Sequence, residues 1–452
     1  MKILIAGNGK LGETIAKQLS AEKHDITLVD SDQSVLDSAL NRYDILAIHG
    51  NCASMDILRQ ADVEKADLLI AVTGSDEVNL LCCTTAHWLN PSIHTIARIR
   101  NPEYDEQAYS MRDAFALSMI LNPEKQAATE IERLVKYPGF LKRETFAKGR
   151  MEIVELRVDA GSKLCNVALS SLNSIVKCRV LVCAVLRNGQ AVAPSGTFEL
   201  REGDRIFVTA PTDTLSLLLK NLGIITHKVR KVMLVGGGKM SFYLAQELLK
   251  SRIDVTVLDK SPAICRDFAD ALPKATVICG DASNQQIFED EGLSAYDALV
   301  TLTGLDELNM IVSLYGSTCG VEQIITKLGK TDNTSILDKM HLGSVISPRK
   351  LCCNTIVRYV RAMHKQTGAA ITVHSIADGQ AEAMEFPVDE GTLNQGVPLK
   401  KIKLKDNILL VGVNRGAETE IPNGDTSFAK GDSVVIVSSN PTVITELNDI
   451  FA

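Results

Sequence analysis

Two glycine-rich loops of nearly the same sequence lie far apart in this chain of 452 residues. They read "GNGKLG" at 7–12 and "GGGKMS" at 236–241. Each follows a short apolar run and precedes a helical pattern, and an acidic residue ends the next apolar run about 20 residues later. These acids are Asp30 and Asp259. The pattern is typical of a strand, turn and helix that cradle the pyrophosphate of a dinucleotide.

The residue types suit that chemistry. Gly7 permits a tight turn, Gly9 lets a pyrophosphate approach the backbone, and Gly12 lets the helix pack closely on the strand. The helix N-terminus then faces the phosphates. Either carboxylate would accept ribose hydroxyls and repel a 2′-phosphate, which favours NAD over NADP. The alternative is a tight turn without a ligand, and it is stronger in the second loop, where a serine replaces the third glycine.

Other repeated loops are expected at the same sheet edge, because the carboxyl ends of parallel strands converge there. In each half, one such loop follows the third strand. Asn51 and Asp281 in these two loops could bond an adenine edge, and Cys52 and Ala282 lie next to them in the sequence. Two more follow the fourth strand beside the pyrophosphate path, at Thr73–Gly74 and Thr303–Gly304. Ordinary turns are the alternative for all four. The acids of "TGSDEVN" and "TGLDELN" suit either ligand contact or a helix N-terminus.

A basic segment, "ARIRNPEY" at 97–104, places Arg98 and Arg100 on the same side of an expected strand. Two guanidinium groups beside a phosphate loop would form an anion clamp, and a solvated basic edge is the alternative. In the second half only Lys327 remains, and Gly329 stands opposite Arg100. The second site is therefore expected to be less suited to additional phosphates.

The elements that must position these loops repeat with them. "KILIAGNGKLGETIAKQL" at 2–19 matches "KVMLVGGGKMSFYLAQEL" at 231–248, and later motifs follow in the same order. We interpret this as a tandem duplication that divides near residue 225. Alternating strands and helices in each half predict an α/β fold with two Rossmann-like doubly wound parallel-sheet domains, each followed by a small α+β module. The expected domains are 1–139, 140–222, 228–364 and 365–452, with linkers near 140–150, 222–230 and 364–371.

One helical stretch, which starts at Pro123, presents Ile131, Leu134 and Val135 on one face. Two placements are open from the sequence. The helix either packs on its own sheet or crosses into a neighbouring unit.

Composition excludes several classes of function. The net charge is −7 and aromatic residues make up 4% of the chain, which disfavours nucleic-acid binding. No stretch approaches the roughly 20 apolar residues that a spanning helix needs. The 11 cysteines lack metal-ligand spacing and are expected to be reduced thiols, so no metal site is predicted. No histidine recurs between the halves, so a shared general acid is not supported. This favours a nucleotide sensor over the alternatives, an NAD-dependent oxidoreductase with duplicated cofactor domains or a scaffold with vestigial loops.

The tandem layout, with "GNGKLG", "TGSDEVN", "ARIRNPEY" and "GDAS", resembles the family of Trk potassium-uptake regulatory subunits, which carry two RCK (regulator of potassium conductance) units in one chain. The resemblance covers nearly the whole sequence. It implies a cytoplasmic protein, peripheral at the inner face of the cell membrane, that binds NAD or NADH and also ATP or ADP. It further implies a tetrameric ring that gates a membrane potassium channel or transporter subunit, and no enzymatic activity.

The resemblance also assigns site residues. For the first site it implies phosphate contacts from Gly7, Asn8, Gly9, Lys10, Leu11 and Arg98, a ribose contact from Asp30, a border at Thr73 and Gly74, and a third-phosphate contact from Arg100. For the second site it implies the same roles for Gly236, Gly237, Gly238, Lys239, Met240, Asp259, Thr303, Gly304 and Lys327. The departures are Ser241, Gly329 and Asn51, where a family member carries Asp. They put the ATP response of the second site in question more than its binding of NAD.

Overall fold

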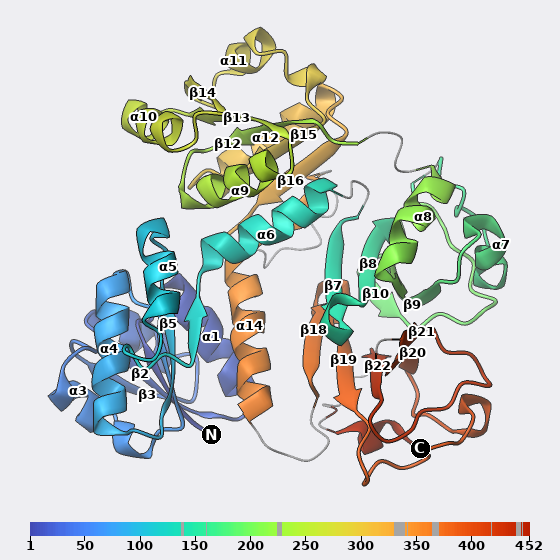
Figure 1. Ribbon diagram of the computed structural model, residues 1–452, viewed down its shortest axis with the longest axis horizontal. Coiled ribbons are helices and arrows are strands. Elements are labelled where there is room, and N and C mark those ends of the chain that lie inside the picture. Colours follow the sequence, from blue (N-terminus) through green and yellow to red (C-terminus); the bar gives the residue numbers. More distant parts are fainter. Residues whose placement is uncertain are drawn as a thin grey trace.

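The fold is known from a computed structural model that contains four β-sheets, two parallel and two antiparallel. The structure describes residues 1–136, 140–159, 161–223, 228–329, 340, 342–363, 370–416, 418–439, 444 and 446–452. Figure 1 shows the two parallel-sheet domains at the left and top and the two smaller modules at the right.

The first domain contains a six-stranded sheet in the order β3-β2-β1-β4-β5-β6. Its strands are β1 (Lys2–Ala6), β2 (Asp25–Asp30), β3 (Leu46–His49), β4 (Leu68–Ala71), β5 (His94–Arg98) and β6 (Met119–Leu121). Its helices are α1 (Lys10–Ala21), α2 (Gln33–Leu40), α3 (Met55–Gln60), α4 (Asp76–Leu89), α5 (Pro102–Ser110) and α6 (Pro123–Lys136). All neighbouring strands are parallel, and the order reverses between β1 and β4. Ligands of doubly wound folds bind at this switch point.

The second parallel-sheet domain repeats the arrangement in the order β14-β13-β12-β15-β16-β17. Its strands are β12 (Lys231–Val235), β13 (Asp254–Asp259), β14 (Thr276–Cys279), β15 (Ala298–Thr301), β16 (Gln323–Lys327) and β17 (Ser344–Ile346). Its described helices are α9 (Lys239–Lys250), α10 (Pro262–Ala271), α11 (Gln285–Asp290), α12 (Asp306–Thr318) and α14 (Pro348–Met363). The predicted duplication of a Rossmann-like fold is therefore confirmed.

The two smaller modules have antiparallel sheets of the same topology, in the orders β10-β9-β11-β8-β7 and β18-β19-β22-β20-β21. The first module contains β7 (Lys142–Phe146), β8 (Met151–Arg157), α7 (Leu172–Val176), β9 (Leu181–Arg187), β10 (Gln190–Val192), β11 (Arg205–Pro211) and α8 (Thr212–Leu222). The second contains β18 (Thr372–Ile376), β19 (Ala381–Pro387), β20 (Ile408–Arg415), β21 (Glu418–Glu420) and β22 (Ser433–Ser438). The linker expected at 140–150 is wrong, because β7 lies within it and pairs with β8. Of the other two expected linkers, residues 224–227 and 364–369 lie outside the described residues.

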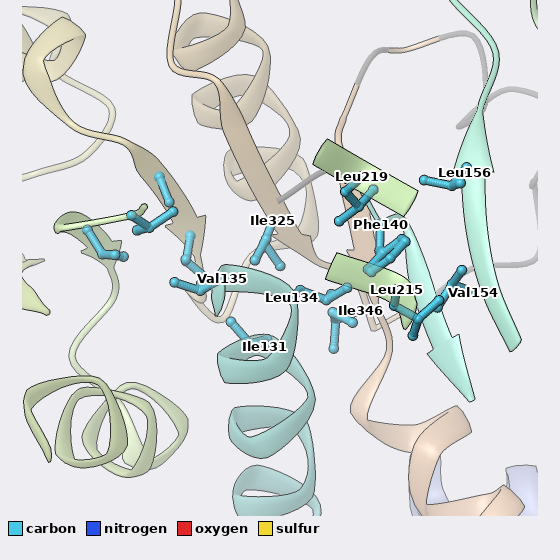
Figure 2. Close-up of a cluster of buried hydrophobic side chains, with 14 of the residues drawn as sticks. Ile131, Leu134, Val135, Phe140, Val154, Leu156, Leu215, Leu219, Ile325 and Ile346 are labelled. Carbon is cyan, nitrogen blue, oxygen red and sulfur yellow. The ribbon is translucent and has the colours of Figure 1, made fainter. Parts of the chain in front are cut away.

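Helix α6 crosses from the first half into the second, which decides between the two placements left open by the sequence. Ile131, Leu134 and Val135 are fully buried in a cluster that includes Ile325 of β16 and Ile346 of β17 (Figure 2). The helix packs on α9, and the side chain of Gln323 donates a hydrogen bond to Leu134 O at 2.6 Å. The apolar face of α6 thus covers the sheet of the other half.

Helix α14 makes the reciprocal crossing. Cys352, Ile356 and Val360 are fully buried against the first domain, in one cluster with Ile3 and Ile15. The helix lies along α1 and also touches α6, as Figure 1 shows near the centre of the molecule. The two parallel-sheet domains therefore exchange helices within one chain, and each sheet depends on the other half for part of its cover.

The two small modules pack sheet against sheet. Their shared core contains Phe146, Met151 and Phe207 from the first module and Val411 and Val435 from the second. The contact is close at Gly412, where a Cβ would lie 2.3 Å from the Met151 sulfur atom. Glu385 adds a polar link, since its carboxylate accepts a hydrogen bond from the backbone N–H of Ala147 at 3.0 Å.

The stability of the fold should depend on pH through a buried acid on α6. Burial, with the neighbouring Glu144 carboxylate, raises the pKa of Glu130 from 4.5 to about 7. The folded chain therefore holds this proton more tightly than the unfolded chain, and the free energy of unfolding falls as the pH rises through this interval. We expect Glu130→Gln to be more stable than the wild type by about 1–3 kcal/mol at pH 8 and equal to it near pH 4. Denaturant unfolding at both pH values tests this, and a difference that does not change with pH would contradict it.

Candidate nucleotide-binding site

The first glycine loop joins β1 to α1 at the switch point of its sheet. Gly7 has φ +95°, a conformation that favours glycine, and a Cβ there would lie 2.8 Å from the Cα of Thr73. A Cβ on Gly12 would lie 2.0 Å from Gly7 O, so a larger residue at this position would require the loop or α1 to shift. Gly9 has no atom within 4 Å of its Cβ position. Open space thus faces the backbone where a pyrophosphate was expected.

The second loop has the same backbone form and accommodates the serine. Gly236 has φ +105°, and its N–H donates to Leu258 O at 2.7 Å, as that of Gly7 donates to Val29 O at 2.8 Å. Ser241 is fully buried, and its hydroxyl donates a hydrogen bond to Gly236 O. The departure from glycine is therefore offset by a polar contact within the loop.

The two acids that end β2 and β13 hold the loops in place. Asp30 accepts hydrogen bonds from the backbone N–H groups of Asn8 at 2.5 Å and Asp32 at 2.9 Å. Asp259 accepts the equivalent bonds from Gly237 at 2.6 Å and Ser261 at 2.8 Å. Each carboxylate retains acceptor capacity for a ribose hydroxyl, because an ionised carboxylate accepts about four hydrogen bonds.

A hydrogen-bond network that was not predicted from the sequence joins the ends of β4 and β5. Asn79 is fully buried, accepts hydrogen bonds from the N–H and hydroxyl of Thr73 at 2.8 Å, and donates to Arg98 O at 2.8 Å. Asn309 joins Thr303 to Lys327 O in the same way. The asparagine that ends both "TGSDEVN" and "TGLDELN" is the sequence feature that could have indicated this role.

The repeated aspartate of that motif has a structural role. Asp76 accepts hydrogen bonds from the backbone N–H groups of Arg100 and Asn101, each at 2.8 Å, and thereby holds the loop after β5. Asp306 accepts from Gly329 N at 2.9 Å. Both aspartates lie in the first turn of their helices, in agreement with the helix N-terminal interpretation. Each also holds a loop through hydrogen bonds, which that interpretation did not include.

The two predicted arginines both contact the loop that follows β4. Strand β5 ends at Arg98, and Arg100 lies just beyond it. Arg98 donates to Thr73 O, and Arg100 donates to Gly74 O at 2.7 Å, on the loop expected beside the pyrophosphate. Burial, reinforced by the charge of Arg100, lowers the pKa of Arg98. Within the described part of the chain, the buried Nε atom of each arginine has no hydrogen-bond partner.

A cavity of about 990 Å³ connects the two halves at this point. Of the predicted residues it is lined by Gly7, Gly9, Lys10, Leu11, Asp30, Asn51, Cys52, Thr73, Gly74 and Arg98 of the first half, and by Met240, Gly304 and Lys327 of the second. The other residues that line it include Glu124 at the start of α6, Arg349 at the start of α14, Asp306 and Gly329. Part of the predicted second site thus opens into the same space as the first.

The remaining predicted residues are not among the described residues that line this cavity. They are Asn8, Gly12, Arg100, Gly236, Gly237, Gly238, Lys239, Asp259, Asp281, Ala282 and Thr303. The buried Asn8 side chain donates to Val35 O at 3.3 Å, so it faces α2. Asp281 is exposed and accepts from Ser283 N at 2.9 Å, which lowers the pKa of Asp281. Lys239 lies close enough to the carboxylate of Glu77 to lower the pKa of that acid, after the larger effect of the Ser75 hydroxyl.

Two family models match this chain in alternation. The TrkA-N domain model matches residues 3–122 and 232–348, and the TrkA-C domain model matches residues 153–223 and 383–451. The chain belongs to the TrkA family. A Trk system potassium uptake protein TrkA homolog of Archaeoglobus fulgidus is 30% identical over 96% of this chain and 97% of its own length. The Trk system potassium uptake protein TrkA of Vibrio alginolyticus is 28% identical over 100% of this chain and 98% of its own length.

Solved structures resemble the chain in fold. A crystal structure of the GsuK RCK domain has a TM-score of 0.63 and 16% sequence identity, with 97% of this chain and 92% of that chain covered. Among the described residues of this family member, no helix is both long enough and apolar enough to cross a membrane.

Gly12 and Gly9 of the first loop differ in the space around their Cβ positions, so they provide a matched pair of substitutions. We expect Gly12→Ala to lower the free energy of unfolding by about 1–3 kcal/mol, because its Cβ would collide with Gly7 O. Gly9→Ala should change stability by no more than about 0.5 kcal/mol, since its Cβ would enter open space. Denaturant unfolding measures both. Equal losses in the two variants would contradict the assigned packing.

Proposed function

We propose that this chain is a nucleotide-sensing regulatory subunit of a potassium uptake system and that it has no enzymatic activity of its own. The observation that carries the proposal is the cavity into which the first glycine loop and part of the second site both open. A ligand there contacts both halves at once, so its binding energy depends on how the halves are placed. The names of the relatives, which are Trk system potassium uptake proteins, support the potassium part of the proposal.

The proposed ligands are NAD or NADH and, as a second class, ATP or ADP. The acids Asp30 and Asp259 at the ends of β2 and β13 favour an unsubstituted ribose. Solved structures of the related fold include a GsuK channel bound to NAD, with a TM-score of 0.61, and GsuK bound to ADP, with a TM-score of 0.50. The full set of predicted site residues, including those outside the cavity, remains part of this proposal.

The proposed partner is a membrane potassium channel or transporter subunit, which the chain meets as a peripheral protein at the cytoplasmic face of the membrane. We further propose assembly into a homo-oligomer, a tetrameric ring. The structural neighbour titled GsuK channel, 16% identical, carries this fold in a channel protein. The units we propose for this assembly are 1–139, 140–222, 228–364 and 365–452.

The two exchanged helices offer a route from ligand to partner. Pro123 and Glu124 at the start of α6 and Pro348 and Arg349 at the start of α14 line the cavity. At their other ends the chain continues to β7 and β18, the first strands of the small modules. A nucleotide that binds one placement of these helices more tightly shifts the ring toward that state. By reciprocity, docking on the partner must change nucleotide affinity by the same factor.

The alternative, an NAD-dependent oxidoreductase, requires a group that transfers a proton near the nicotinamide. No histidine is among the described residues that line the cavity. Steady oxidation of NADH with small carbonyl substrates would refute the regulatory proposal, and we expect none.

Asp30→Ala tests the ligand assignment. We expect it to weaken NAD binding at the first site about tenfold to a hundredfold, because the variant loses a charged acceptor that also holds Asn8 N. Isothermal titration calorimetry measures the effect. Asp25→Ala, at the exposed opposite end of β2, is the matched control and should bind as the wild type does. Equal affinity in the two variants would refute the assignment.

A further inference from the structure

The two halves differ in where they place the second cation of the anion clamp. Position 100 of the first half is an arginine, and its backbone N–H is held by Asp76 at 2.8 Å. The equivalent position is Gly329, whose N–H is held by Asp306 at 2.9 Å. The same hydrogen bond in both halves establishes that these positions correspond, so the second half has lost one arginine at this loop.

The guanidinium group of Arg349 occupies the space that the lost side chain would need. A Cβ built on Gly329 would lie 2.9 Å from Arg349 Nη2 and 3.5 Å from its Cζ. A side chain at position 329 and the present placement of Arg349 therefore exclude each other. Arg349 can take this position because residue 329 is a glycine.

The second residues of α6 and α14 differ in charge in the opposite sense to the loop positions. Arg349 is the second residue of α14 after Pro348, as Glu124 is the second residue of α6 after Pro123. The first half thus carries an arginine in the loop and a glutamate on the helix, whereas the second half carries a glycine in the loop and an arginine on the helix. The positive charge has moved to another element without leaving the site.

Arg349 and Lys327 both line the shared cavity, and they lie close enough for the charge of Arg349, after the larger effect of burial, to lower the pKa of Lys327. The charges of Asp306 and Glu124 oppose both effects on that pKa. Glu124 faces the pair from the first half, and within the described part of the chain its buried Oε2 atom has no hydrogen-bond partner. A lysine and an arginine side by side suit a ligand that carries more than one negative charge.

We propose that Lys327 and Arg349 form the anion subsite of the second half, in which Arg349 contacts the terminal phosphate of a nucleoside diphosphate or triphosphate. This inference rests on the proposed function, since it specifies the ligand class of the second nucleotide site. It replaces the expectation that the second half lacks a second phosphate-binding cation. A nucleotide bound to the first half is the competing occupant, because the cavity also contains the first loop.

Calorimetric titration with AMP, ADP and ATP tests the proposal in an Asp30→Ala background, where binding to the first site is weakened. We expect Arg349→Gln to lower the ratio of ATP affinity to AMP affinity about tenfold, because the variant loses a charge-assisted hydrogen bond to the terminal phosphate. AMP affinity should stay unchanged. Lys350→Gln is the matched control, since it removes the same charge from the next residue, which does not line this cavity.

A charge-exchange variant shows whether a lower ratio reflects the loss of the arginine and not a loss of folding. Gly329→Arg combined with Arg349→Glu recreates the arrangement of the first half, and we expect it to recover the preference for ATP. Thermal unfolding of each variant without ligand shows whether it folds.

The outcomes separate the two levels of the proposal. If the Asp30→Ala chain binds no nucleotide, both the proposed function of the second site and this inference fail. If it binds AMP and ATP but Arg349→Gln leaves their ratio unchanged, the inference alone fails. If the ratio falls in an Asp259→Ala background but not in the Asp30→Ala background, Arg349 serves the first site across the interface, and the assignment to the second half is overturned.

Discussion

The reciprocal exchange of α6 and α14 is the interaction on which the rest of this structure depends. A parallel sheet is stable only when both faces are covered, and here part of each cover comes from the other half of the chain. The exchange brings α9 against α6, and the hydroxyl of Tyr243 on α9 accepts a hydrogen bond from Asn122 at 3.0 Å. The two glycine loops are consequently held at one interface. The first loop and part of the second site line one cavity.

The same helices connect this interface with the small modules. Each begins at the cavity, and the chain leads from its end into the first strand of an antiparallel sheet. The module sheets are locked together by a tight contact between Met151 and Gly412 and by the hydrogen bond from Ala147 to Glu385. Each helix is thus connected along the chain to a packed interface, and packed interfaces tend to switch between discrete arrangements and not to deform gradually.

Much of the site was predictable because its parts are local. A strand, a turn with Gly7 and an acid such as Asp30 follow one another in the chain, so their spacing alone indicates the loop chemistry. Asn79 was missed although it repeats as Asn309, since a buried amide that joins two strand ends has no characteristic spacing. Arg349 was missed for a different reason. Its guanidinium group meets Gly329 through space, and only the charge reversal relative to Glu124 marks it in the sequence.

The sequence by itself determined the duplication, the parallel-sheet character of the larger domains, the α+β character of the small modules, and the glycines and acids of each loop, because these follow from local periodicity and from steric limits on the backbone. Tertiary structure alone decided which sheet α6 covers, since an apolar face such as that of Ile131 and Leu134 fits either sheet equally well. It also decided that the first loop and part of the second site line one cavity and that Arg349 replaces a missing arginine. Such contacts join separate elements through space and depend on packing geometry, which no local pattern encodes.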